Sequence, residues 1–110
     1  MKERSWNDFE KIELRAGTIV KVLGFPEARN PAYQVWVDLG GLGIKKSSAQ
    51  ITQLYSKEEL IGKQVVCVVN FPPKQIARFI SEILITGFET PEGVVLTSVD
   101  GEVPNGTKLS

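Results

Sequence analysis

The 110-residue sequence contains no histidine and only one cysteine, and its basic and acidic residues balance at 13 each. The absence of histidine removes the commonest general base and the commonest metal ligand. Cys67 stands in the apolar run VVCVV, which is typical of a small buried side chain rather than a nucleophile. No glycine-rich phosphate loop opens a predicted helix. We therefore expect no catalytic residues, no metal and no cofactor, and we interpret the chain as a binding protein without a small-molecule substrate.

Long apolar runs are also missing. None approaches the about 18 residues that a membrane-spanning helix requires. The N-terminal stretch MKERSWNDFEK lacks the apolar core of a secretory signal, and a lone cysteine fits a reducing compartment. We therefore expect no membrane insertion and a cytoplasmic location. The length and the 42% apolar content predict one domain over residues 1–110.

The net charge of zero argues against strong non-specific binding of nucleic acid, but the charge is unevenly distributed. Residues 39–81 carry six basic and two acidic residues, whereas residues 82–110 carry one basic and five acidic residues. A basic segment of this kind can form one face toward a polyanion, or it can be an ordinary solvated surface. Both interpretations stay open on charge alone.

Alternating apolar residues predict an all-β fold, a β-barrel with short helices. The strand-like runs occupy residues 14–25, 32–40, 43–50, 63–71, 80–88 and 94–99. Gly17 and Gly24 inside the first run predict bulges or sharp curvature, and the GGLG stretch at 40–43 predicts a hairpin turn. The prolines of residues 26–31 indicate a loop.

Three short helices complete the predicted layout. Residues 6–11 and 57–60 each follow a serine with an acidic residue at capping spacing. Residues 48–55 place apolar side chains at helical spacing, which predicts an amphipathic helix of about two turns. About five main strands, with a helix between the third and the fourth and short terminal extensions, are the layout of a five-stranded OB-fold barrel.

Trp36 has polar neighbours in its predicted strand and so lies outside the expected core. An exposed indole can be a stacking platform for a nucleotide base. It can also pack under a terminal helix or a partner subunit, and we favour this second interpretation because large indoles usually find cover.

Several segments together resemble a known family, the free-standing tRNA-binding-domain proteins, and in particular the CsaA-type secretion chaperones. The segments are DFEKIELRAGTIV (8–20), FPEARNPAYQVWVDLG (25–40), GIKKSSAQIT (43–52), IGKQVVCVVNFPPKQIARFISEILI (61–85) and VPNGTKL (103–109). The resemblance implies an OB-fold, a symmetric homodimer and recognition of tRNA by its shape and backbone. It also implies a chaperone role, in which unfolded preproteins are held for export.

The segment NFPPKQIARFISE carries the residues that the resemblance assigns to RNA binding: Asn70, Lys74, Ser81 and Glu82. One position departs from the family pattern, because Arg78 stands where a glycine is usual. If that position needs a positive φ, Arg78 carries about 1 kcal/mol or more of strain. Arg78 can alternatively add a cation for phosphate.

Ser81 and Glu82 interrupt an apolar run, where a carboxylate is costly unless it is hydrogen-bonded or paired. They can accept backbone N–H groups or a cation and lock the basic loop, or they can hydrogen-bond a nucleotide. We favour the lock, because buried polar groups more often satisfy protein partners than ligands.

The complete predicted RNA-binding set adds cations from two other elements, the loop at 26–31 and the strand at 43–50, to this segment. It comprises Arg29, Lys45, Lys46, Asn70, Lys74, Arg78, Ser81 and Glu82. Apolar grooves for preprotein segments are predicted around Phe25, Trp36, Phe71 and Phe79, although each of these residues can equally belong to the core or to a dimer interface. The expected partners are tRNA, unfolded polypeptides and a second copy of the chain. A chaperone that does not bind RNA is the alternative function.

Overall fold

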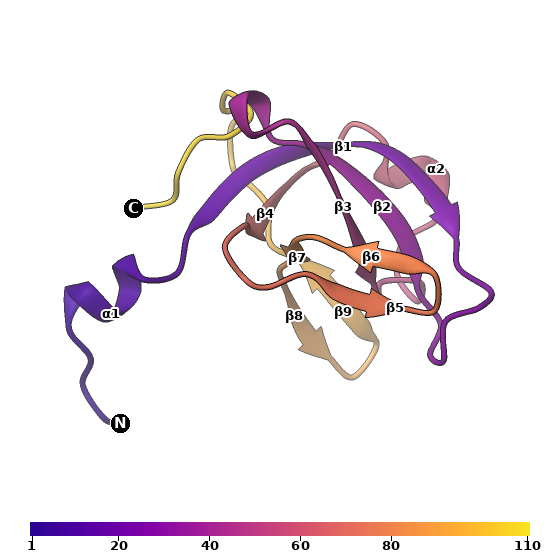
Figure 1. The fold of residues 1–110 in the computed structure, drawn as a ribbon, viewed down its shortest axis with the longest axis horizontal. Coiled ribbons are helices and arrows are strands. Elements are labelled where there is room, and N and C mark those ends of the chain that lie inside the picture. The colour runs from indigo at the N-terminus through magenta and orange to yellow at the C-terminus, as the bar shows by residue number, and fades with distance from the viewer.

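The computed structural model describes residues 1–110, and its main feature is a five-stranded antiparallel sheet that curls into a nearly closed barrel (Figure 1). The strands follow the order β3-β2-β1-β4-β7, so β3 and β7 are the two edges. Their bounds are β1 Leu14–Gly24, β2 Tyr33–Asp38, β3 Ile44–Ala49, β4 Gln64–Val68 and β7 Leu84–Ile85. The all-β prediction and the five-stranded OB-like barrel are confirmed.

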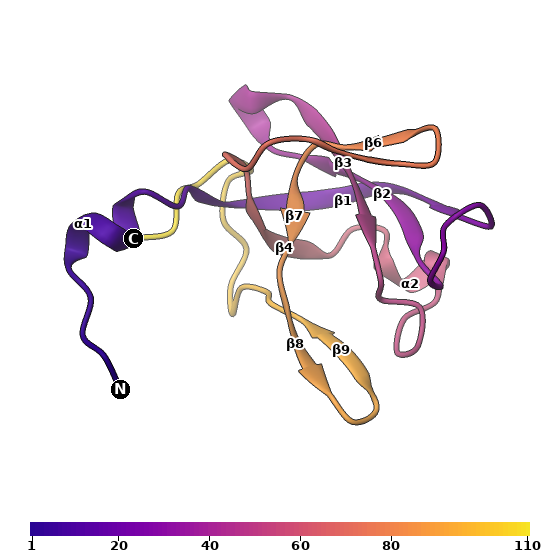
Figure 2. The same cartoon turned by 60° about the horizontal axis from the view of Figure 1, so that its bottom comes forward.

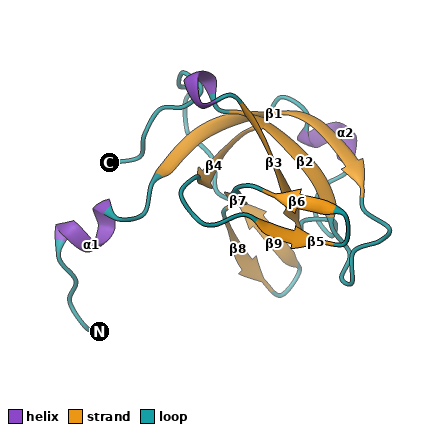
Figure 3. Ribbon diagram, viewed as in Figure 1, coloured by secondary structure: helices purple, strands orange, loops and turns teal.

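Two hairpins and short helices surround the barrel (Figure 3). One hairpin lies over the barrel beside β3, and the other projects away from it, while helix α1 projects at the N-terminal end (Figure 2). Their bounds are β5 Lys74–Ile76 with β6 Phe79–Ser81, β8 Gly87–Thr90 with β9 Gly93–Leu96, α1 Trp6–Glu10, the 3-10 helix η1 Gly40–Leu42, and α2 Lys57–Leu60. No helix has the length and apolar character needed to cross a membrane.

Local capping signals position both α-helices. Ser5 and Asp8 form a capping box at α1, and Ser56 and Glu59 form one at α2, as their spacing predicts. Helix α2 stands between the third and fourth strands, which confirms that part of the layout. The turn at residues 40–43 is also confirmed, with positive φ at Gly40 and Gly43.

The predicted helix over residues 48–55 is wrong. Ser48 and Ala49 belong to β3, where they pair with β2, and residues 52–54 form turns. Ile51 is buried, but Leu54 is 40% exposed, so the segment does not bury a helical apolar face. Sheet pairing therefore overrides the helical spacing of these residues.

The predicted strand 80–88 is interrupted at Ser81 and Glu82. β6 ends at Ser81, β7 begins at Leu84, and Gly87 starts the projecting hairpin. The segment 74–76, which the sequence suggested was a loop, is the strand β5. One expected strand is therefore three short ones, and each belongs to a different sheet.

The core fills the barrel with apolar side chains from every strand of the large sheet. It contains Ile19, Val35, Val37, Leu39, Ala49, Ile51, Leu60, Val65, Cys67, Ile83 and Ile85. Val66 and Val68 on the opposite face of β4 are also buried, within this single chain. The apolar run of β4 is therefore covered on both faces within the chain.

The expected bulges do not lie at the glycines of β1. The pairing of β1 with β2 shifts register between Ile19 and Lys21, which places the irregularity at Val20. Gly17 has a different role, because a Cβ there would lie 2.5 Å from Cγ1 of Val37 and 2.7 Å from Cδ2 of Leu39. Gly17 thus permits close contact between β1 and the core side chains of β2.

We predict that Gly17→Ala lowers the free energy of unfolding by about 1–3 kcal/mol, because the added methyl group overpacks this contact. Urea unfolding followed by circular dichroism measures the change. Gly24→Ala in the same strand is the matched control, since a Cβ at Gly24 would meet no atom within 4 Å. Equal destabilisation by the two substitutions would contradict the packing explanation.

Candidate nucleic-acid interface

The seam between the two edge strands of the barrel is closed by the pair Ser81–Glu82. The backbone N–H of Glu82 donates to the carbonyl of Lys46 at 2.8 Å, and its Oε1 accepts the Lys46 N–H at 3.1 Å. Oγ of Ser81 accepts the N–H of Ser48 at 3.0 Å. These bonds join the end of β6 to the free edge of β3. They are the backbone-accepting lock that we favoured from the sequence.

The lock holds the basic β5–β6 hairpin against the basic strand β3. Lys74 is the cross-strand partner of Ser81, and Arg78 lies in the turn at the far end of the hairpin. Lys45 and Lys46 stand in β3, whose backbone the lock engages. Cations from two segments about 30 residues apart in sequence are therefore brought into one region.

None of the predicted cations is in an ion pair. The three salt bridges of the protein join Lys11 to Asp8, Arg15 to Glu13 and Lys108 to Glu10. Arg29, Lys45, Lys46, Lys74 and Arg78 are all absent from them. Their charges are consequently available for an anionic partner.

Aromatic side chains lie beneath the hairpin. Phe79 of β6 packs 5.4 Å from the ring of Phe25 and 5.9 Å, edge to face, from Trp36. The ammonium groups of Lys46 and Lys21 lie 5.3 Å from Phe79 and 4.6 Å from Trp36, respectively. Cation–π attraction therefore helps to hold both lysines at this face.

This cluster changes two expectations. Trp36 does not lie under a terminal helix, because Phe79 of the β5–β6 hairpin packs against it. Phe25 and Phe79 are buried, with 6% and 8% exposure, and thus form a small second core. Phe71 lies apart from them, 43% exposed, beside Lys45 and Glu82 in a pocket of about 290 Å³.

The turn of the hairpin bears the backbone strain, but not at the expected residue. Ala77 has a φ of 54° and is the single non-glycine residue with a positive φ, so Arg78 is not strained in this way. The two central residues of this tight turn join Ile76 to Phe79. The usual cost of the left-handed region for a residue with a Cβ is about 1–2 kcal/mol.

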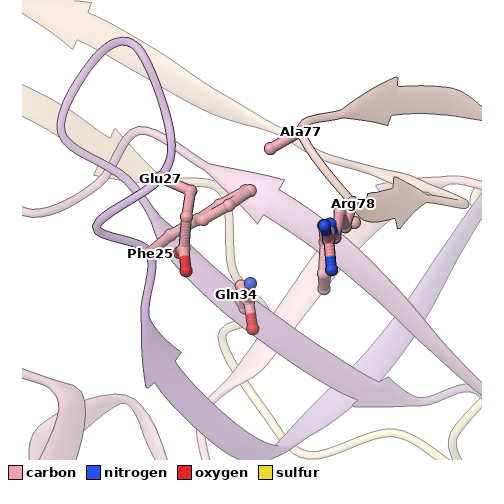
Figure 4. A pocket seen from close by; sticks show the side chains of 6 residues that line it. Phe25, Glu27, Gln34, Ala77 and Arg78 are labelled. Atoms are coloured by element: carbon pink, nitrogen blue, oxygen red, sulfur yellow. The ribbon is translucent and has the colours of Figure 1, made fainter.

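A pocket of about 450 Å³ opens between this turn and the β1–β2 loop (Figure 4). Its lining residues are Phe25, Glu27, Gln34, Ala77, Arg78 and Phe79. Glu27 and Gln34 were missed in the sequence analysis. Only the packing of the loop on the hairpin, which no local motif signals, brings them beside Arg78.

The remaining predicted site residues are placed differently. Asn70 uses its whole amide within the protein: Oδ1 accepts the N–H of Glu13 at 2.9 Å, and Nδ2 donates to the carbonyl of Lys11 at 2.8 Å. Asn70 therefore ties β4 to the segment between α1 and β1. Arg29 is exposed in the β1–β2 loop, whose Ala28 packs against the Phe25–Phe79 cluster.

Two titratable groups, Cys67 and Glu13, have a clearly altered pKa. Burial raises the pKa of the Cys67 thiol to about 12, so it stays protonated at neutral pH. The hydrogen bond from Arg15 lowers the pKa of Glu13 below its usual value. No group of three or more His, Cys, Asp or Glu side chains could hold a metal ion.

The fold and this region define a class of protein: a small OB-type barrel whose edge strand and adjoining hairpin carry unpaired cations, with aromatic side chains beneath the hairpin. Residues 14–108 match the family described as "Putative tRNA binding domain". The chain belongs to this tRNA-binding domain family. The family is defined by binding and not by a reaction.

Solved structures agree over the whole chain. The chaperone CsaA from Bacillus anthracis is 48% identical, with a TM-score of 0.92, and the match covers 99% of this chain and 100% of that one. The CsaA chaperone protein from Picrophilus torridus is 50% identical, with a TM-score of 0.93, over 98% of this chain and 100% of that one. The similarity to CsaA-type chaperones is thus confirmed.

The curated relatives include a methionine–tRNA ligase from Pyrococcus furiosus, which is 38% identical over 109 residues. The match covers 99% of this chain but only 15% of the ligase. The shared part is therefore a small portion of that enzyme.

We predict that Glu82→Ala lowers the free energy of unfolding by about 1–3 kcal/mol, because the N–H of Lys46 loses its acceptor. Urea unfolding gives the global effect, and amide hydrogen exchange should show faster exchange at Lys46. Glu92→Ala is the control, since Glu92 is exposed and makes no hydrogen bond, and should change stability by less than about 0.5 kcal/mol. Unchanged exchange at Lys46 would show that the bond does not hold the seam.

Proposed function

We propose that this protein is a cytoplasmic homodimer that binds structured tRNA through the basic face and holds unfolded preprotein segments for export. The observation that carries the RNA-binding part is the docking of the β5–β6 hairpin on β3 by Ser81 and Glu82. This docking gathers cations that have no acidic partner within the chain. The family match over residues 14–108 supports the same partner.

The roles within the RNA site follow from the contacts of each residue. Lys45, Lys46 and Lys74 would contact phosphates, Arg78 would contact the RNA from the hairpin turn, and Arg29 would extend the face along the β1–β2 loop. Ser81 and Glu82 would act by positioning the hairpin, since their acceptors are engaged by β3. Asn70 would also act indirectly, because its amide bonds the segment before β1 at Lys11 and Glu13.

We place the dimer interface on α1 and the C-terminal segment. Helix α1 has no buried residue, and Trp6 is 62% exposed beside Phe9, with 5.2 Å between the ring centroids. The C-terminal segment lies next to it, because Lys108 Nζ is 3.4 Å from Glu10 Oε2 and Leu109 donates its N–H to the carbonyl of Leu14. A second copy would cover these exposed apolar side chains.

For preprotein segments we favour the pocket at Phe71. It is lined by Leu42, Phe71 and Pro73 together with Lys45 and Glu82, whereas Phe25 and Phe79 are already buried. The similarity to the two CsaA structures supports a chaperone role. A chaperone for exported polypeptides that does not bind RNA is the second candidate, and the exposure of Phe71 is the observation in its favour.

We predict that the protein binds unfractionated tRNA with an affinity that falls steeply between about 50 and 200 mM salt. The double variant Lys74→Ala/Arg78→Ala should weaken binding and lower the slope of log K against log salt by about one per lost phosphate contact. Filter binding or fluorescence anisotropy measures both quantities.

The matched control for this titration is Lys57→Ala/Lys63→Ala, which removes the same charge from α2 and the turn after it. Its slope should remain that of the wild type. Binding of an unfolded apolar peptide without any binding of tRNA would refute the RNA part and leave the chaperone alternative.

We predict a dimeric mass in solution at micromolar concentration, and a monomeric mass for Trp6→Asp, because the charge would be buried at the proposed interface. Sedimentation equilibrium measures the mass. Phe88→Asp is the control, since Phe88 is 66% exposed in the β8–β9 hairpin and should leave the dimer intact. A monomeric wild type would refute dimerisation, and a dimeric Trp6→Asp would refute this interface.

A further inference from the structure

The pocket between the β1–β2 loop and the β5–β6 turn combines an apolar floor with three polar side chains. Phe25 and Phe79 are its buried aromatic components. Figure 4 shows the amide of Gln34 lying, in that view, between the carboxylate of Glu27 and the guanidinium of Arg78. Its volume of about 450 Å³ falls in the range of roughly 300–1,000 Å³ that small-ligand pockets occupy.

The three polar groups have no partner within the protein. No hydrogen bond of the chain involves the carboxylate of Glu27, the amide of Gln34 or the guanidinium of Arg78, and the full set of three salt bridges includes neither charged residue. Opposite charges therefore line one pocket without pairing. Such a set can engage a ligand that offers both donors and acceptors along one edge.

The wall of this pocket also contains the strained residue of the chain. Ala77, with its φ of 54°, lines the pocket directly before Arg78. Strained backbone persists where the surrounding structure enforces it, and it concentrates at ligand sites. The strained turn thus forms part of the pocket wall and places Arg78 in it.

Glu27 is the feature that selects the ligand. A carboxylate beside unpaired cations repels phosphate, and when ionised it can only accept hydrogen bonds. It therefore requires a ligand that presents donors at this point. Among the nucleobases, guanine carries two adjacent donors, N1–H and the N2 amino group, followed along the same side by the acceptors O6 and N7.

We propose that this pocket binds an unpaired guanine base, with Glu27 accepting from N1–H and N2–H, Gln34 donating to O6, and Arg78 donating to N7. The three groups offer an acceptor for the donors of guanine and donors for its acceptors. The aromatic side chains of Phe25 and Phe79 supply the apolar contact for the base. Adenine, cytosine and uracil lack the paired donors that Glu27 requires.

The inference rests on the proposed RNA binding, because the cations around the pocket would hold the phosphates on either side of the base. It adds a base preference to a face otherwise suited to backbone recognition. The same guanine could come from an RNA loop or from a free nucleotide, and the experiment separates these sources.

The test uses the full-length protein and RNA hairpins that differ in one unpaired loop base: guanine, inosine, adenine or uracil. We expect the guanine hairpin to bind about tenfold more tightly than the adenine hairpin. Inosine, which lacks the N2 amino group, should fall between them. In Glu27→Gln the preference for guanine over inosine should disappear, while the affinity for the adenine hairpin stays within about twofold.

Glu92→Gln is the matched control, because it removes the same charge from the turn of the β8–β9 hairpin and should retain the preference. Titration with guanosine and adenosine monophosphates is the second arm. Equal binding of all hairpins by the wild type would overturn the guanine site but leave the proposed RNA binding intact. Glu27-dependent binding of guanosine monophosphate, without binding of any RNA, would support the pocket and refute the proposed function.

Discussion

The hydrogen bonds between the Ser81–Glu82 pair and the backbone of β3 are the interaction on which the functional face depends. An OB-type barrel with edges at β3 and β7 leaves backbone N–H groups unpaired at its seam. Side-chain oxygens here accept two of them, and a backbone bond from Glu82 to Lys46 completes the junction. A continuous strand would pair with these N–H groups through its own carbonyls, whereas here two side-chain oxygens take that place. The polar pair that interrupts the apolar run is therefore used in closing the seam.

The same junction determines where the charges lie. The hairpin that precedes Ser81 is bonded to β3 and packs on Trp36 of β2, so its basic residues are joined to the strand that carries Lys45 and Lys46. Phe79 fills the space beneath with Phe25 and Trp36, and it presents its ring to the ammonium group of Lys46. The packing that buries the aromatic cluster therefore also positions the cations at the surface. A substitution that opens the seam would change both the aromatic packing and the positions of the cations.

The local features of the fold could be predicted from the sequence. The capping boxes and the alternation that sends Val35 and Val37 inward depend on spacing alone. The failures all depend on distant pairing. The spacing of Ile51, Leu54 and Tyr55 favours a helix over residues 48–55, yet the pairing of β3 with β2 continues to Ala49. Lys21 faces Trp36 only because of the register shift at Val20, which no glycine marks. Likewise, Glu27 and Gln34 become part of a pocket only through the packing of two loops.

The hairpin turn explains how an arginine can replace the glycine of the family pattern. A two-residue turn in a hairpin of right-handed twist needs a positive φ at its first central position, and here that position is Ala77, one residue before Arg78. The positive φ therefore falls on an alanine, whose side chain is a single methyl group. Arg78 has no positive φ, and its side chain lines the pocket. The turn keeps this conformation because both its ends are fixed, since Ile76 and Phe79 both pack in the aromatic cluster. The cost of about 1–2 kcal/mol at Ala77 is therefore offset by contacts that the fold already makes.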